Sequence, residues 1–456
     1  MLNTILNKTI KNKNFLSFAG NGISAIFGVI VFALLARTFS ADVFGEWVIY
    51  LSTATFIEMF RFGLTRTGLV RFLSGAKGDE RARLMGTNYI IGLVITGLIF
   101  IILYIILFLF QKPILASPYK LFFTWYPLLA LFNLPFNNAL TVLQSEEKFF
   151  QIMVIKVVNL ASFALLLALN YFYDWHLSLQ SLIIYHLAIN LATSVFVIIK
   201  RWDGIFFINY FDKETLKTLL EFGKYTTVTL IGSNLLRSAD TFILSISPLG
   251  SAAVATYSIP LKLMEMLQIP LRSFASTAFP RLSRASINNE MGKFKFYFYH
   301  YTGIVTFMFL PIIVICFIFA KYFVLTLGGA QYLKPFPLTG ESTVFLFQIF
   351  VLYGFLLPVD RMTGVGLDAI NKPEKNFYKI IAMVIANIIG DLIAVFVFKK
   401  LLYVAYATWI FTVVGVILGW VYLDKEVSLN FRKIFAIGWK SIIQYLFRKQ
   451  TEYELK

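Results

Sequence analysis

The sequence has few charged residues and almost no cysteine. Charged residues make up 14% of the 456-residue chain, against roughly 25% in ordinary soluble domains. The single cysteine, Cys316, lies inside an apolar stretch, which excludes an intrachain disulfide and a multi-cysteine metal site. What the chain has instead is 58% hydrophobic residues and a mean hydropathy of +0.75. These values exclude a soluble globular protein and indicate a membrane protein with several spans.

The signatures of common enzyme chemistry are missing as well. No glycine-rich phosphate loop ending in Lys-Ser or Lys-Thr occurs, so ATP hydrolysis by that motif is excluded. The three histidines, His176, His186 and His300, are scattered, and no Asp-x-Asp pair is present. We therefore expect no cofactor, no metal site and no enzyme activity.

Long apolar runs recur along the whole chain. A membrane-spanning helix needs about 20 mostly apolar residues. Twelve runs meet this requirement, and they predict an all-α integral membrane protein with about twelve transmembrane helices. The predicted spans cover residues 15–37, 46–66, 86–110, 120–144, 150–170, 178–199, 223–246, 253–276, 298–320, 342–366, 377–398 and 402–423.

Basic residues outside the spans lie mostly on one side of the membrane. The loops on the side of the N-terminus hold most of them, and the opposite loops hold only Arg37, Lys112, Lys120, Lys321, Lys334, Lys399 and Lys400. Because cytoplasmic loops carry an excess of Lys and Arg, both termini are predicted to be cytoplasmic. The same rule explains the net charge of +17 without a nucleic-acid partner.

The spans divide into two halves of six. Residues 203–222 separate the halves and mix aromatic with charged side chains, which is typical of an amphipathic surface segment. The predicted organisation is a six-helix bundle over 1–202, a cytoplasmic linker over 203–222, a second six-helix bundle over 223–424 and an amphipathic cytoplasmic tail over 425–456.

The second half repeats features of the first. A Ser-Ala-x-Val motif at 40–43 recurs at 251–254, and at the same offset Arg61 matches Arg272. Because six is an even number of spans, the two halves have the same orientation. Such parallel repeats are related by a pseudo-two-fold axis along the membrane normal, with the substrate site between them. Arg61 and Arg272 are then expected to face a central cavity.

Several ionisable residues lie inside the predicted spans. Each costs roughly 2.5–3.5 kcal/mol at mid-bilayer, so they must face protein, water or the interface. Acid–base pairs that are three residues apart or adjacent have two possible roles. They take part in function, or they neutralise one another and hold helices together. The full set is Glu58, Arg61, Arg66, Lys156, Arg237, Asp240, Lys262, Glu265, Arg272, Asp360, Arg361 and Asp391.

Polar stripes at helical spacing run along the same spans. Asn133, Asn137 and Thr141 form one of them, and the bases of the spans outnumber their acids. A mildly cationic, wet cavity suits an anionic substrate. Arginine in particular suits a diphosphate, because its planar fork holds two oxygens.

Two stretches resemble a known family. They are Ala36–Trp47 (Ala-Arg-Thr-Phe-Ser-Ala-Asp-Val-Phe-Gly-Glu-Trp) after the first span and Arg237–Leu244 (Arg-Ser-Ala-Asp-Thr-Phe-Ile-Leu) in the seventh. Both resemble the bacterial polysaccharide-unit (O-antigen type) flippases of the multidrug/oligosaccharidyl-lipid/polysaccharide (MOP) exporter superfamily. The resemblance implies two six-helix bundles in a MATE-like arrangement that work by alternating access.

The resemblance also implies a substrate and a location. The substrate would be a polyprenyl-diphosphate-linked oligosaccharide, flipped from the inner to the outer leaflet of the bacterial cytoplasmic membrane. Membrane lipid, the polysaccharide polymerase and the chain-length machinery are the other implied partners.

On this hypothesis the intramembrane residues have separate roles. Arg61 and Arg272 would hold the diphosphate, and Arg237, Lys262 and Lys156 would add positive potential. Hydrogen bonds to the sugar would come from Asn137 and Asn234, with Asn133, His186 and Asn190. Candidates for coupling to a proton or sodium gradient are Asp391, Asp240 and Glu58.

Alternatives stay open. An ion-coupled drug or metabolite exporter of the same fold is the main one, although the first span lacks the acid that is usual in the drug-exporting branch. A membrane polymerase or acyltransferase and a passive scaffold are the others. The sugar composition, the coupling ion and the oligomeric state are not encoded in any motif.

Overall fold

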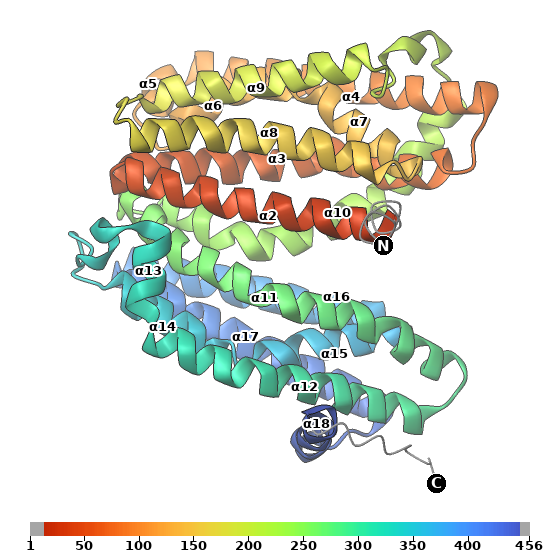
Figure 1. Cartoon of the computed structure of the whole chain (residues 1–456), viewed down its shortest axis with the longest axis vertical. Helices are drawn as coiled ribbons and strands as arrows, with labels where there is room; N and C mark the ends of the chain where they lie inside the picture. Colours follow the sequence, from red (N-terminus) through yellow and green to blue (C-terminus); the bar gives the residue numbers. More distant parts are fainter. Residues whose placement is uncertain (1–12, 447–456) are drawn as a thin grey trace, which may run out of the picture. The chain divides into compact units, whose positions relative to one another are not determined.

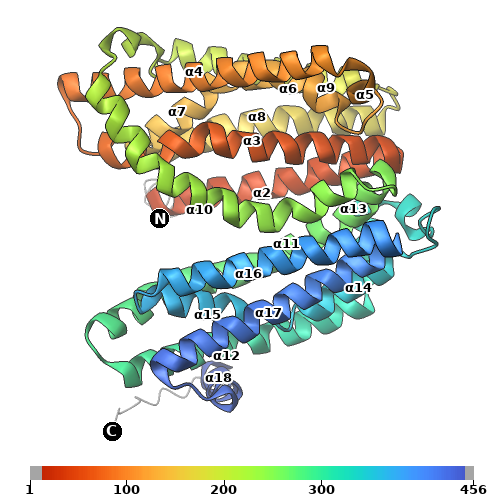
Figure 2. The same cartoon turned by 180° about the vertical axis from the view of Figure 1, so that it is seen from behind.

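The computed structural model describes residues 13–446, which are helical without any strand. Several side chains at the start of α2, in the middle of α10 and at the end of α18 are also outside the description. The chain forms two compact units, Met1–Asn234 and Leu235–Lys456. Within each unit the long helices run side by side (Figures 1 and 2).

The N-terminal unit contains α2 (Lys13–Thr38), α3 (Ala41–Leu73), α4 (Gly78–Leu109), α5 (Gln111–Leu115), α6 (Lys120–Phe132), α7 (Leu134–Ser145), α8 (Phe149–Phe172), α9 (Leu179–Ile199) and the 3₁₀ helix η1 (Ile205–Tyr210). The division between the units falls inside α10 (Lys213–Ser245). The C-terminal unit continues with α11 (Gly250–Ile287), α12 (Met291–Ile318), α13 (Ala320–Gly328), η2 (Ala330–Leu333), α14 (Thr343–Tyr353), α15 (Leu357–Ala369), α16 (Pro373–Leu392), the π-helix η3 (Ile393–Phe398), α17 (Leu401–Val427) and α18 (Phe431–Leu446).

The same order of helices recurs in the two units. In each, the third long helix is followed by a short one, α5 or α13, and the fourth is broken into two pieces. The second piece of each broken helix, α7 or α15, begins with Leu-Pro, at Pro135 and Pro358. Proline has no N–H for the bond to the preceding turn, which explains why both helices break there. The pseudo-two-fold relation between the units stays a prediction.

Seven described helices are long and apolar enough to cross a membrane, or eight if the bent pair α14–α15 counts as one span. They include α2, α4, α8, α9, α12, α16 and α17. The remaining predicted spans correspond to α3, α10, α11 and the broken pair α6–α7, which are interrupted or carry charges along their length. The number twelve therefore remains a prediction, while the all-α membrane fold is confirmed.

The segment 203–222 contains a short helix and the start of a long one. Residues 205–210 form η1, and α10 begins at Lys213 and continues without a break into the next predicted span. η1 packs on α4 at Gly86, where a Cβ atom would collide with the carbonyl oxygen of Phe207. Leu219 of α10 is fully buried against α3 and α4. This segment is therefore packed on the N-terminal unit, and its role as an amphipathic linker at the cytoplasmic surface stays a prediction.

Candidate functional site

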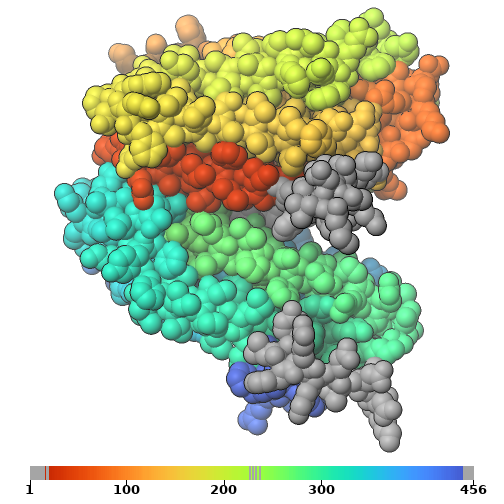
Figure 3. All heavy atoms as spheres, viewed as in Figure 1, coloured from red at the N-terminus to blue at the C-terminus, as the bar shows by residue number. Residues whose placement is uncertain are grey.

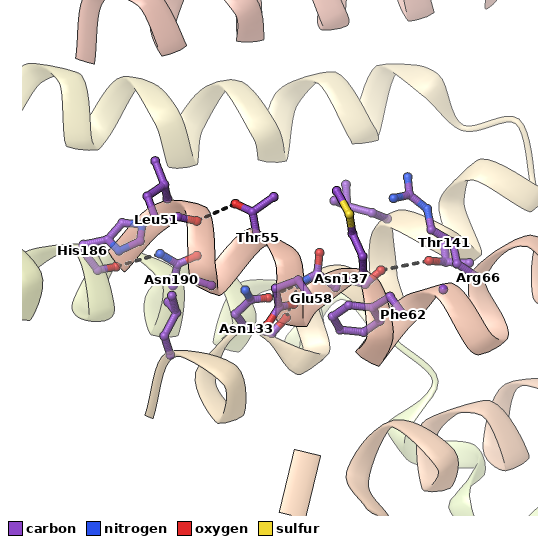
Figure 4. A pocket seen from close by; sticks show the side chains of 15 residues that line it. Leu51, Thr55, Glu58, Phe62, Arg66, Asn133, Asn137, Thr141, His186 and Asn190 are labelled. Atoms are coloured by element: carbon purple, nitrogen blue, oxygen red, sulfur yellow. Dashed lines mark hydrogen bonds between the residues drawn. The ribbon is translucent and has the colours of Figure 1, made fainter. Parts of the chain in front are cut away.

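The N-terminal unit contains an open cavity of about 410 Å³ that is lined by both polar and apolar side chains. Figure 4 shows His186 and Asn190 at one end of it and Arg66 and Thr141 at the other. The wall is formed by α3, α6, α7 and α9, and by the residue between α6 and α7. The lining residues are Leu51, Ala54, Thr55, Glu58, Met59, Phe62, Gly63, Arg66, Leu129, Asn133, Asn137, Leu140, Thr141, His186 and Asn190.

The break between α6 and α7 places amide groups on this wall. Asn133 is the residue at the break, and its carbonyl oxygen accepts hydrogen bonds from both the backbone N–H (3.1 Å) and the side-chain amide (3.1 Å) of Asn137. One turn further, Thr141 donates to the carbonyl oxygen of Asn137 at 3.1 Å. On α9, the amide of Asn190 donates to the carbonyl of His186 at 2.8 Å. The predicted polar stripes on these helices therefore meet in one cavity.

Glu58 is on the wall of the cavity, and Arg61 lies behind it. The Arg61 side chain is fully buried, and its Nη1 atom lies 2.5 Å from Oε1 of Glu58. The hydroxyl of Tyr126 donates to the same carboxylate oxygen at 2.8 Å. The guanidinium lies 4.5 Å above the centre of the Phe62 ring. This geometry confirms the ion pair that the i, i+3 spacing suggested, and Arg61 does not line this cavity of the N-terminal unit. That Arg61 faces a central cavity between the two halves stays a prediction.

Arg66 is the base that the cavity presents instead. It also lines a second cavity of about 160 Å³, together with Lys156. No acid is found among the residues that line this second cavity, which are Leu16, Gly20, Asn21, Arg66, Leu140, Gln144, Phe149, Ile152, Met153 and Lys156. The two cavities thus share Arg66. The smaller cavity is cationic, and the larger one is lined by several amide groups.

The sequence analysis assigned no individual role to Arg66, although the spacing of polar residues on its helix indicates that it lines the cavity. Thr55, Glu58, Met59, Phe62 and Arg66 all line the cavity, and their spacing follows one face of α3. The isolated charge at the end of that face was the missed indication.

The C-terminal unit holds two buried carboxylates in one cluster. The Asn387 side-chain amide donates to Asp240 at 3.0 Å and to Asp391 at 3.1 Å. The Tyr257 hydroxyl donates to Asp240 at 2.6 Å and lies 3.3 Å from the Thr408 hydroxyl. Asp391 is 0% exposed and Asp240 is 5% exposed. One oxygen of Asp391 has no partner among the described residues.

This cluster has a chemical consequence. Two carboxylates in one buried site repel each other and are costly to keep charged without a countercharge. Their neighbours in the cluster are an amide and two hydroxyls, which are neutral. Among the described residues, the cluster thus offers the two carboxylates only neutral hydrogen-bond partners. Among residues 13–446, no group of three His, Cys, Asp or Glu side chains is arranged to hold a metal ion.

The other predicted site residues of the C-terminal unit are spread over α10, α11 and α15. Lys262 and Glu265 form the expected pair at 3.1 Å and are about one-third exposed. Arg272 is exposed on α11, and Asn234 is half-buried. The side chain of Arg237 lies outside the described residues.

The adjacent residues Asp360 and Arg361 do not neutralise each other. Asp360 pairs with Lys379 of α16 at 2.7 Å, and the Lys379 ammonium also donates to the Asp360 carbonyl oxygen at 2.7 Å. Lys379 itself is only 3% exposed. The correct partner is on another helix, which sequence spacing does not reveal.

Comparison with solved structures shows the fold. A multidrug resistance MATE family transporter of the MOP superfamily, in an inward-facing conformation, aligns with a TM-score of 0.71 at 16% identity over 89% of this chain and 94% of that one. The lipid II flippase MurJ in an inward closed conformation gives 0.70 at 17% identity over 96% and 94%. A MOP superfamily transporter from Pyrococcus furiosus gives 0.58 at 16% over 91% and 94%.

Comparison with protein families and curated sequences shows the family to which the chain belongs. No curated protein sequence matches the chain. The profile of a family described as polysaccharide biosynthesis protein matches residues 10–286, which is more than half of the sequence. The chain is therefore a member of the polysaccharide biosynthesis protein family, and it is a multi-pass membrane protein with the fold of the MOP superfamily transporters.

Proposed function

We propose that this protein flips a polyprenyl-diphosphate-linked oligosaccharide from the inner to the outer leaflet of the bacterial cytoplasmic membrane. The observation that carries the proposal is the pair of adjoining cavities in the N-terminal unit. Arg66 and Lys156 lie on the smaller one, and three asparagine amides line the larger one together with Glu58 and apolar side chains. An oligosaccharide diphosphate has the same order of groups, an anionic one next to a polyhydroxylated one. Family membership supports a substrate from polysaccharide biosynthesis.

The diphosphate is proposed to bind Arg66 and Lys156. The guanidinium fork holds two phosphate oxygens, and the ammonium adds a point charge. Arg61 acts indirectly, because it holds Glu58 at the cavity wall. Further phosphate contacts are proposed from the C-terminal unit, namely Arg272, Lys262 and Arg237.

The sugar is proposed to bind the amide groups. Asn133, Asn137 and Asn190 offer donors and acceptors at the cavity wall, and His186 adds a ring. Asn234, on α10, is proposed as a further sugar contact. Groups of this kind match the hydroxyls of many sugars, which suits a carrier of a multi-sugar unit.

The Asp240–Asp391 pair is proposed as the coupling site. A pair that must hold a proton or a small cation changes its charge when that ion leaves, and this change can drive a conformational step. Glu58, the third predicted candidate, is less suited because Arg61 already neutralises it. Alternating access then moves the substrate, with both termini in the cytoplasm and the polymerase and chain-length machinery receiving the product.

The test is translocation by the purified full-length protein in liposomes. A fluorescent polyprenyl-diphosphate oligosaccharide is incorporated in both leaflets, and an impermeant reductant bleaches the outer pool. A flippase makes the inner pool accessible, and protein-free liposomes keep it protected. Protection that persists while a cationic dye is exported along an ion gradient would overturn the proposal in favour of a drug exporter. Elongated sugar product in detergent would indicate an enzyme.

A further inference from the structure

Helix α18 has a different direction from the other helices of its unit. Figures 1 and 2 show α18 nearly end-on, while α12 runs across the page beside it. Its atoms stand at the surface of the C-terminal unit (Figure 3). A helix that crosses the membrane-spanning helices lies along the membrane plane and not across it.

The position of α18 is fixed by contacts at several points. A Cβ atom on Gly303 of α12 would collide with the backbone of Ile434 and Gly438, so the two helices cross in direct backbone contact. Nδ1 of His300 lies 2.7 Å from the Ser441 hydroxyl.

The turn before α18 is fixed as well. The Asn430 N–H donates to the Tyr299 hydroxyl at 2.7 Å, and the Leu429 N–H donates to Asp424 at 2.5 Å. α18 is therefore packed in a defined position on the C-terminal unit.

The helix has three distinct faces. At about 100° per residue, the residues buried against α12 group on one face, and two further groups centre about 120° to either side of it. The buried residues are Ile434, Gly438 and Ser441. The second face is an apolar stripe with side chains 39–56% exposed, formed by Phe431, Phe435, Trp439 and Ile443. The third face is basic, with Lys433 and Lys440, and the third base, Arg432, lies within the apolar stripe, between Trp439 and Ile443.

We propose that α18 binds the surface of an acidic phospholipid leaflet. The apolar stripe would enter the acyl boundary, where Trp439 suits the headgroup level. The helix contains three bases and no acid, so its charge is complementary to phospholipid phosphates. Each base near an acidic leaflet adds roughly a fivefold gain in affinity. This inference does not depend on the transported substrate.

The test is amide hydrogen exchange of residues 431–444 in the full-length protein. The protein is placed in nanodiscs of phosphatidylcholine, or of the same lipid with a third replaced by phosphatidylglycerol. Exchange is expected to slow by roughly twentyfold in the acidic discs, and high salt should remove most of this gain. The variant Arg432→Gln/Lys433→Gln should lose the gain while α12 exchanges as before.

The matched control is Lys399→Gln/Lys400→Gln, which removes two adjacent exposed bases from another part of the unit. It should keep the full effect of acidic lipid. A second variant, Trp439→Ser, should speed exchange in both kinds of disc, because it shortens the apolar stripe. Equal exchange of the wild-type helix in both discs would overturn the proposal. So would slowing that requires two copies per disc, since that result identifies a second chain as the occupant.

Discussion

The two units share an order of helices but differ in the charges that they place in their main polar sites. The N-terminal unit keeps its bases Arg66 and Lys156 on the walls of open cavities, next to amides. The C-terminal unit keeps its acids Asp240 and Asp391 in a closed cluster. The same order of helices therefore supports two different polar sites. The broken fourth helix, which both units share, does not determine which charges a site contains.

The difference indicates a division of labour. An open cationic cavity is accessible to a large anionic substrate, whereas a sealed acidic pair admits only a proton or a small cation. Buried charge in the N-terminal unit is balanced locally by the Glu58–Arg61 pair. In the C-terminal cluster no base is among the hydrogen-bonded neighbours that the structure describes, and on the proposed function a proton or a small cation supplies the balance.

The largest expected effect comes from breaking the balanced pair. Arg61→Ala should lower the free energy of unfolding by about 3–5 kcal/mol, because Glu58 would stay buried without a countercharge. Thermal unfolding in detergent, followed by circular dichroism, measures the loss. The control is Arg361→Ala on α15, whose side chain is exposed, and it should change little. A loss no greater than that of the control would show that Glu58 is neutralised in another way.

The next effect tests the open cavity. Arg66→Ala and Lys156→Ala should each weaken binding of a polyprenyl-diphosphate oligosaccharide by roughly 10–100-fold, which is the contribution of a hydrogen bond to a charged group. Microscale thermophoresis of the purified variants measures the affinity. Lys112→Ala removes an exposed base from the same unit and should bind as the wild type does. Unchanged affinity in both cavity variants would assign the diphosphate to another set of bases.

The acidic pair is tested by its ion dependence. Asp391→Asn should abolish acceleration of flipping by a proton or sodium gradient, an effect of about tenfold, while leaving substrate affinity within about twofold. Flipping rates in liposomes with and without each gradient provide the measurement. Glu58→Gln serves as the comparison in the other unit and should keep the gradient response. If Asp391→Asn responded to the gradients as the wild type does, coupling would have to lie elsewhere.

Much of the fold follows from the sequence because its signals are local. Continuous apolar runs identify the spans, and the prolines at 135 and 358 stand where two of them break. The i, i+3 pairs Glu58–Arg61 and Lys262–Glu265 form as their spacing suggested. Each of these features depends on residues within one or two helical turns.

The features that the sequence does not reveal depend on contacts between helices. Asp240 and Asp391 meet through Asn387 although they are far apart in the chain, and Asp360 selects Lys379 over its own neighbour. The amphipathic composition of residues 203–222 does not show where this segment packs. In the structure, η1 lies against the backbone of α4 at Gly86. Periodicity identifies a face of a helix but not the helix that covers it.

The smallest expected effect concerns the segment 203–222, where a single buried carboxyl group, that of Asp203, has no basic partner in the part of the chain that the structure describes. Asp203 precedes η1 and is 1% exposed, and burial raises the pKa of its carboxyl from 3.8 to about 6, against the opposing effect of nearby backbone N–H groups and Tyr89. The folded state thus binds the proton more tightly, so stability should fall as the pH rises from about 4 to 6 and then level off. Asp203→Asn should remove this slope and gain about 1–2 kcal/mol above pH 6. Melting temperatures of the variant and the wild type between pH 4 and 8 measure the difference, with exposed Asp79→Asn as the control. Parallel curves would mean that the Asp203 carboxylate is already well solvated, and that the docked segment opens to water.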